Sequence, residues 1–156
     1  MGRAILLLAL LSGWTAAQQL PPPLSQQISS LHEQVQSLAQ GGQLAAAHGA
    51  TAVMRRYGER MARDFTRFDQ ELLNRAGDLG MRLPASAVPP GFSTGGSDFD
   101  RSFLAWAATR TQQLLNALRT GQRAAGPLAG LAGSLLPLVE VHSQLNLALR
   151  QPGAPV

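Results

Sequence analysis

Four stretches of this chain carry apolar side chains at steps of three or four residues. The series cover residues 24–45, 54–72, 104–118 and 128–149. Because an α-helix repeats every 3.6 residues, each series lies along one side of a helix. Four such helices bury their apolar sides most simply against one another. The pattern therefore predicts an all-α fold, a four-helix bundle.

Three of these series include aromatic or polar residues. The second consists of Met54, Tyr57, Met61, Phe65, Phe68 and Leu72. The third consists of Leu104, Ala107, Thr111, Leu114 and Leu118. The fourth consists of Leu128, Leu131, Leu135, Leu138, His142, Leu145 and Leu149. Aromatic residues fill the second series, so we expect Phe65 to lie in the core. Thr111 and His142 place polar groups on otherwise apolar sides.

The ends of the first two helices follow from capping and breaking residues. We expect helix one over residues 24–47, with Gly41 and Gly42 inside it. Paired glycines inside a helix mark either a kink or a close helix approach, and the apolar series continues through them, which favours close approach. Helix two is expected from near Thr51 to near Gly80, because glycine followed by Leu83-Pro84 is a strong stop signal.

The last two helices are expected at Ser97 and Pro127. Ser97 is the predicted N-cap of helix three, with Asp100 three residues on in a capping box, and this helix ends within residues 119–121. Pro127 suits the first turn of helix four. Pro137 lies inside that helix and should bend it about one turn earlier.

One long connection separates the second and third helices. Residues 81–96 are rich in proline and glycine, which makes a helix there unfavourable. Extended, they reach about 50 Å, more than the length of helix two at about 1.5 Å per residue. The connection is therefore long enough to cross over the length of the bundle. A loop at one end fits its composition equally well.

The first residues have the composition of a secretory leader. Residues 1–17 contain Arg3, then an apolar centre, then the small residues Thr15-Ala16-Ala17, which predicts cleavage before Gln18 and export. The apolar run is shorter than the roughly 20 residues of a membrane span. An uncleaved signal anchor is the alternative. The predicted organisation is a signal peptide over residues 1–17, an extended leader over 18–23, a bundle domain over 24–150 and a flexible tail over 151–156.

Residues 124–139 contain no charged side chain and form a second apolar run. Two prolines, three glycines and a length of sixteen residues favour a buried bundle helix over a membrane span. We therefore expect no stable membrane span after the signal is removed. The chain has no cysteine, so neither a disulfide nor a thiol-linked lipid is available.

The charge pattern depends entirely on arginine. The net charge is +4, all thirteen basic residues are arginine, and no lysine is present. The high pI reflects that choice, so we expect no nucleic-acid partner. One side of helix two carries Arg56, Arg60, Arg63 and Arg67, opposite its apolar series. This arginine face is either a solvated surface held by Glu59–Arg63 and Arg60–Asp64 pairs or a contact surface for an anionic envelope component.

Four short motifs give the chain a family resemblance. They lie at residues 60–64 (RMARD), 80–84 (GMRLP), 99–103 (FDRSF) and 136–142 (LPLVEVH). In this order and spacing they resemble the bacterial domain-of-unknown-function family 4142, over about residues 30–149. The resemblance implies a ferritin-like four-helix bundle exported to the bacterial envelope, here the periplasm. It implies no established biochemical role.

The chain departs from that family at two positions. Members typically have histidine where this chain has Phe65 and Thr111, and only the histidine at His142 is kept. All three positions lie on the apolar series. A polar cluster in relatives is therefore replaced here by core packing. His142 is either a buried neutral imidazole bonded to a neighbour such as Thr111, or, together with Thr111, an interior ligand contact.

The sequence lacks the residue patterns of metal sites and catalytic sites. No Glu-x-x-His occurs, none of the nine acids lies on an apolar series, and His32 and His48 are expected at the surface. No nucleophile elbow or phosphate-binding loop is present. We therefore expect no metal, no cofactor and no catalytic activity. The leading hypothesis is an exported envelope protein that acts through its surface. The alternative is a binder of a small apolar ligand or a metal in the bundle interior.

Overall fold

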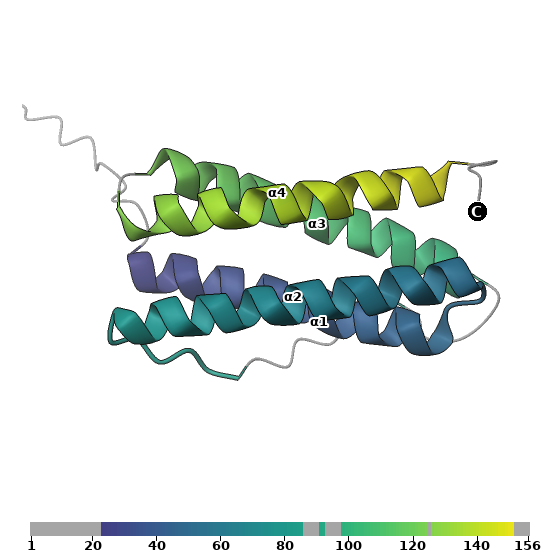
Figure 1. Cartoon of the computed structure of the whole chain (residues 1–156), viewed down its shortest axis with the longest axis horizontal. Coiled ribbons are helices and arrows are strands. Elements are labelled where there is room, and N and C mark those ends of the chain that lie inside the picture. Colours follow the sequence, from purple (N-terminus) through teal and green to yellow (C-terminus); the bar gives the residue numbers. More distant parts are fainter. Residues whose placement is uncertain (1–22, 86–90, 93–97, 125, 152–156) are drawn as a thin grey trace, which may run out of the picture.

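The computed structural model describes residues 23–85, 91–92, 98–124 and 126–151. Its helices are α1 (Leu24–His48), α2 (Ala52–Asp78), α3 (Phe99–Arg123) and α4 (Pro127–Arg150). They pack as a four-helix bundle, and no strand occurs in the described ranges (Figure 1). The predicted all-α fold is confirmed. The predicted signal peptide, most of the leader and residues 152–156 of the tail lie outside the described residues.

Both ends of α2 are defined by the expected residues. Thr51 is the N-cap, and its side chain accepts a hydrogen bond from the Met54 backbone N–H at 3.1 Å. At the other end Gly80 has a φ of 70°. This left-handed conformation lets the Met81 N–H bond the Ala76 carbonyl at 2.8 Å, as in a Schellman cap.

The start and the end of α3 differ from the expectation. The N-cap is Asp98, without a side-chain capping bond, and Ser97 lies outside the described residues. The Asp100 carboxylate does not close a capping box. It accepts a hydrogen bond from the Ala50 N–H at 3.0 Å, in the turn between α1 and α2. The helix also continues to Arg123, because Gly121 is buried against α4 and packing offsets the weak helix propensity of glycine.

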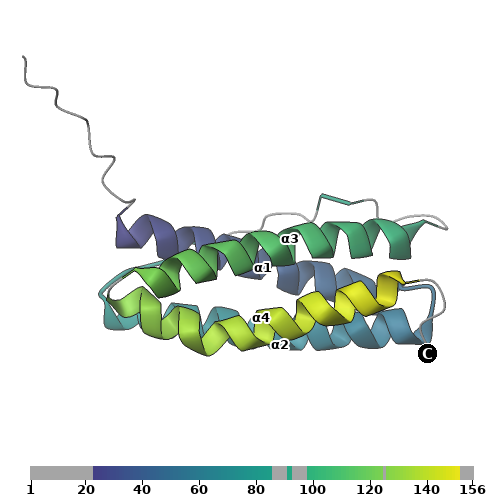
Figure 2. The same ribbon diagram turned by 90° about the horizontal axis from the view of Figure 1, so that it is seen from above.

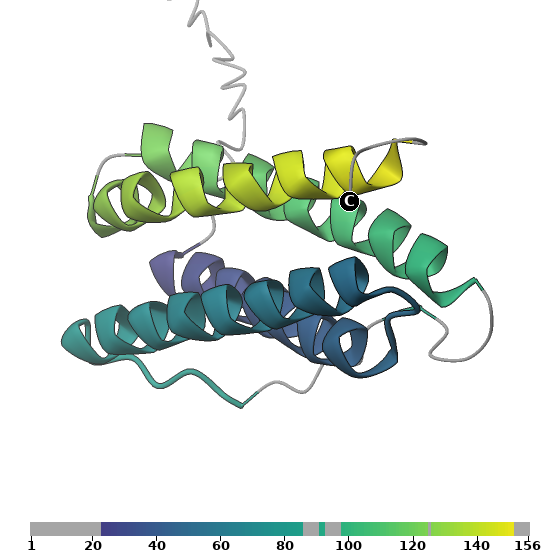
Figure 3. The ribbon, with the colours of Figure 1, turned by 45° about the vertical axis from the view of Figure 1, so that its right-hand side comes forward.

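The bundle consists of two antiparallel hairpins, α1–α2 and α3–α4, which form two layers (Figure 3). α2 ends at one end of the bundle and α3 begins at the other, so these two helices run in the same direction (Figure 1). The connection between them therefore crosses over the length of the bundle. This finding decides between the two arrangements that its composition allowed.

The two glycines of α1 let this helix pack closely against its neighbours α2 and α3. A Cβ on Gly42 would lie 2.5 Å from the Ala62 nitrogen of α2, and a Cβ on Gly58 would lie 2.4 Å from the Ala46 nitrogen of α1. A Cβ on Gly41 would lie 2.3 Å from the Trp106 ring of α3. The helix is continuous through both glycines. Close approach is therefore confirmed.

α4 is continuous through Pro137, although proline removes one backbone hydrogen bond. Its ribbon bows along its length in Figure 2. Pro127 occupies the first turn, as expected. Across the described ranges, no helix combines the length and the apolar character that crossing a membrane requires.

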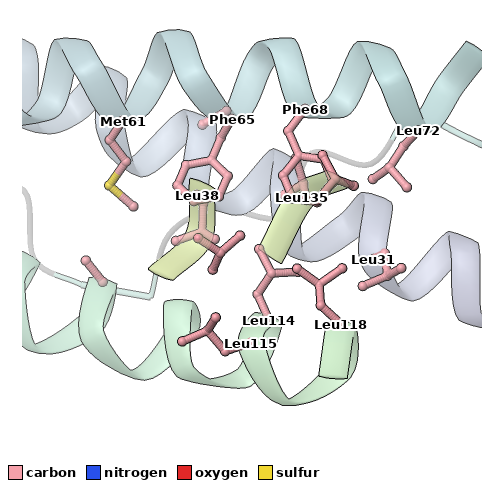
Figure 4. Close-up of a cluster of buried hydrophobic side chains, with 14 of the residues drawn as sticks. Leu31, Leu38, Met61, Phe65, Phe68, Leu72, Leu114, Leu115, Leu118 and Leu135 are labelled. Atoms are coloured by element: carbon pink, nitrogen blue, oxygen red, sulfur yellow. The ribbon is translucent and has the colours of Figure 1, made fainter. Parts of the chain in front are cut away.

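The core lies between the two layers, and the predicted apolar series form most of it. On α4 the prediction is partly wrong: Leu138, Leu145 and Leu149 are only partly buried, whereas Leu136 and Val139, outside the series, are buried. Figure 4 shows Phe65 and Phe68 of α2 directed towards Leu114 and Leu118 of α3. Phe65 is completely buried, and its ring stacks on Phe68 at a centroid distance of 6.3 Å. The prediction that Phe65 is a core residue is confirmed.

Candidate functional site

His142 lies in α4 and is completely buried. Its Nε2 is 3.1 Å from Oδ2 of Asp64 in α2. Burial lowers the pKa of His142, and the Asp64 hydrogen bond and charge only partly offset that effect. The side chain is therefore a neutral imidazole that donates from Nε2. This confirms the interpretation of His142 as a buried neutral imidazole, but its hydrogen-bond partner is Asp64 and not Thr111.

An aromatic ring lies against the imidazole of His142. The Phe65 ring lies 4.9 Å from the imidazole, centroid to centroid. Phe65, the position at which the family resemblance implied a histidine, thus packs against His142 as an aromatic ring. Thr111 is also completely buried, and among the described residues neither its Oγ1 nor Nδ1 of His142 has a hydrogen-bond partner. The two candidate contacts therefore lie in the interior, and no hydrogen bond joins them.

Tyr57 and Asn146 extend this polar region by one helical turn. Asn146 donates to the Leu104 carbonyl at 3.1 Å, and the Tyr57 hydroxyl lies 3.5 Å from the His142 carbonyl oxygen. Burial raises the pKa of Tyr57 to about 12, and a side-chain hydrogen bond with Asn146 opposes that rise. The phenol is therefore held in its neutral form.

His32 is buried, so the expectation of a surface position is wrong. The crossover covers this side of α1. Nδ1 of His32 bonds Oδ1 of Asp69 in α2, and Nε2 lies 3.0 Å from the Pro84 carbonyl oxygen in the crossover. Both ring nitrogens therefore face oxygen acceptors, one on each side of the ring. The helical period could not reveal this contact, because it does not encode the path of the crossover.

His48 is exposed, as expected, and its ring contacts Phe99 edge-on. The acids that pair with the buried histidines were missed because both lie off the apolar series. Asp64 is 20% exposed and directly precedes Phe65, whereas Asp69 is 15% exposed and directly follows Phe68. An acid beside a buried aromatic residue lies at the core boundary and can reach inward. That adjacency was the available signal.

The arginine face is exposed at all four predicted positions. The Arg60–Asp64 pair forms, at 3.5 Å. The predicted Glu59–Arg63 pair is wrong: Arg63 lies 3.6 Å from the other oxygen of Asp64, which is nearer along the helix. Arg56 and Arg67 have no acidic partner within the described chain. Asp64 therefore joins the arginine face to the buried His142.

The buried histidines do not form a metal centre. Among the described residues, no group of three histidine or carboxylate side chains lies close enough to hold an ion. Each buried histidine has one carboxylate, and metal sites in bundles need several inward ligands. The residues present therefore fit hydrogen-bonded pairs that hold helices together.

Comparison with known families matches residues 11–149 to DUF4142, a domain of unknown function. The chain belongs to the DUF4142 family. The match covers most of the chain and begins before the region in which the four motifs lie. No curated protein and no solved structure matches the chain. Family membership thus agrees with the observed bundle and assigns no activity to it.

Proposed function

We propose that this DUF4142 protein is a non-catalytic, exported envelope protein that acts through its surface. The arginine face on α2 is the observation that carries this proposal. Its four guanidinium groups are exposed, and two of them, Arg56 and Arg67, have no acidic partner among the described residues. Such a surface suits an anionic component of the envelope, for example a phosphate-bearing lipid headgroup.

Export is supported by the leader-like residues 1–17 and by the family resemblance. The single long crossover also supports a ferritin-like relationship, because ferritin-like bundles are connected in that way. N-terminal sequencing of the protein from its host tests export. We expect a start at or near Gln18, and a start at Met1 would indicate an anchored protein.

A non-catalytic role is supported by the placement of the buried titratable groups. His142 and His32 each bond a carboxylate between helices, where they stabilise packing. The alternative of a ligand in the bundle interior has less support, because aromatic and aliphatic side chains fill the space around His142.

Vesicle binding tests the arginine face. The chain without residues 1–17 should bind vesicles containing phosphatidylglycerol and not vesicles of phosphatidylcholine alone. Arg56→Glu with Arg67→Glu should weaken that binding at least about tenfold, since each basic residue near an anionic surface contributes about 1 kcal/mol. Arg123→Glu with Arg150→Glu makes the same charge change at other exposed positions. Equal losses from both double variants would contradict a specific arginine face.

A further inference from the structure

A groove runs between α1 and α3, on a part of the surface that the arginine face does not include. It consists of two adjoining hollows of about 540 Å³ and about 500 Å³, both lined by Ser30 and Asn116. Small-molecule sites typically have volumes of roughly 300–1,000 Å³. Each hollow therefore has the size of a small-molecule site.

The first hollow is apolar and uncharged. Its floor consists of Leu31 of α1, Ala117 and Leu118 of α3, and Leu128 and Ala132 of α4. No charged side chain among the described residues lines it, although the chain carries 13 basic and 9 acidic residues. An aliphatic group would bury its surface here without removing any charge from water.

The second hollow is polar and contains an unsatisfied buried group. Ser37 is only 2% exposed, and within the described structure its hydroxyl has no hydrogen-bond partner. The same is true of Oε1 of Gln34, whose amide nitrogen donates to Ser30 at 3.2 Å. A buried polar atom without a partner is costly, and such atoms are uncommon in native proteins. Both side chains line this hollow, so a ligand with hydroxyl groups would satisfy both atoms once the side chains rotate towards it.

The charges at the rim of the second hollow do not select an ion. Glu33 and Arg110 both line it, with one charge of each sign. The arginine donates to Gln113 at 3.4 Å. Neither an anionic nor a cationic headgroup is therefore preferred, and neutral hydroxyl or amide groups fit best.

We propose that the α1–α3 groove binds one uncharged amphiphile, with its aliphatic chain in the apolar hollow and a hydroxyl-bearing head against Ser37 and Gln34. The continuity of the two hollows carries this assignment, because they offer hydrophobic burial and unsatisfied hydrogen-bonding groups side by side. The site is independent of the arginine face, so either proposal can fail without the other.

Calorimetric titration with 1-monodecanoylglycerol, below its micelle concentration, tests the groove in the chain without residues 1–17. We expect saturable binding of one molecule per chain. Sodium decanoate should bind at least about tenfold more weakly, because its carboxylate loses hydration at a site where the charges of Glu33 and Arg110 cancel. Glycerol alone should not bind. Several molecules per chain, no saturation, or equal affinity for decanoate would overturn the proposal.

Two variants locate the site. Ala117→Trp fills the apolar hollow and should weaken binding at least about tenfold, whereas Ala148→Trp adds the same ring at an exposed position of α4 and should have no effect. Ser37→Ala should weaken binding about three- to tenfold, the range for one hydrogen bond. It should leave the unfolding temperature unchanged or higher, since it removes an unsatisfied buried hydroxyl. Unchanged affinity in Ser37→Ala or Ala117→Trp would place the ligand elsewhere.

Discussion

The two buried histidines bond acids of the same helix in different settings. His142 pairs with Asp64 and has Phe65 against its ring, so one nitrogen has a partner and the ring is neutral. His32 pairs with Asp69 and also faces the Pro84 carbonyl, so both of its nitrogens have acceptors. The surroundings of an imidazole, more than its carboxylate partner, thus decide how many of its ring nitrogens have a hydrogen-bond partner.

The pairs also differ in what they connect. The His142–Asp64 pair joins α4 to α2 and so links the two hairpins across the core. The His32–Asp69 pair lies within one hairpin and holds the crossover against it. Loss of the first should affect the packing between the layers, whereas loss of the second should release the crossover.

The largest expected effect comes from removing the aromatic neighbour of His142. Phe65→Ala should lower the free energy of unfolding by about 3–5 kcal/mol, as truncation of buried aromatic residues usually does. It should also admit water to His142. Urea unfolding measures the change, with the partly buried Phe92→Ala on the crossover as the comparison. A loss below about 1 kcal/mol would mean that Phe65 is not packed in the core beside His142.

Alkaline pH tests the phenol next to the His142 region. The folded pKa of Tyr57 is raised from 10.0 to about 12. The unfolded chain therefore releases its proton first as the pH rises, and stability should fall by about 3 kcal/mol as the pH rises from 10 towards 12. The chain has one tyrosine, no cysteine and no lysine, so few other groups titrate there. Tyr57→Phe should abolish the fall, and an unchanged fall would contradict this assignment.

Removing each imidazole compares the two pairs directly. His32→Leu should cost about 2–3 kcal/mol, because hydrogen bonds to charged groups are strong and two acceptors lose their donor. His142→Leu should cost less, about 1–2 kcal/mol, because only one hydrogen bond to a carboxylate is lost and the apolar side chain suits its site. Thermal unfolding of both variants at pH 7 measures the difference. The opposite order would contradict the assignment of two hydrogen bonds to His32 and one to His142.

Acid pH tests the lowered pKa of His142, with a smaller expected effect on stability. The pKa of His142 is lowered, so the unfolded chain takes up this proton before the folded chain does. The wild type should therefore lose stability as the pH falls below about 6.5 and until the folded group also protonates. His142→Leu lacks this loss, so the stability difference between the two proteins should narrow on acidification. A difference independent of pH would show that His142 titrates equally in both states.

The smallest expected signal is metal binding. The wild-type interior provides His142 and Asp64 but no third ligand among the described residues, so titration with zinc, copper or iron should show no tight site. Phe65→His with Thr111→His should create affinity if the histidines of relatives converge there. The short distance between Phe65 and His142 supports that convergence. Stoichiometric binding by the wild type that is lost in His142→Ala would favour the ligand-binding alternative.

The helical period was sufficient to predict the bundle and most of its core. Phe65, Phe68 and Leu72 are buried as their spacing requires, and His142 follows the same rule. The period could not predict the burial of His32, because that depends on where residues far along the chain return. It also could not predict that Asp64 and Asp69, which lie next to the apolar series in the sequence, bond the buried histidines.

The crossover also affects the order in which the protein folds. Each hairpin joins helices that follow one another through a short turn, α1 to α2 and α3 to α4, so its contacts close small loops and form fast. Contacts between the hairpins require closure of the much larger loop that contains the long connection. We therefore expect the two hairpins to form early and their docking to limit the folding rate. The His142–Asp64 hydrogen bond should then form late, and its removal should speed unfolding more than it slows folding.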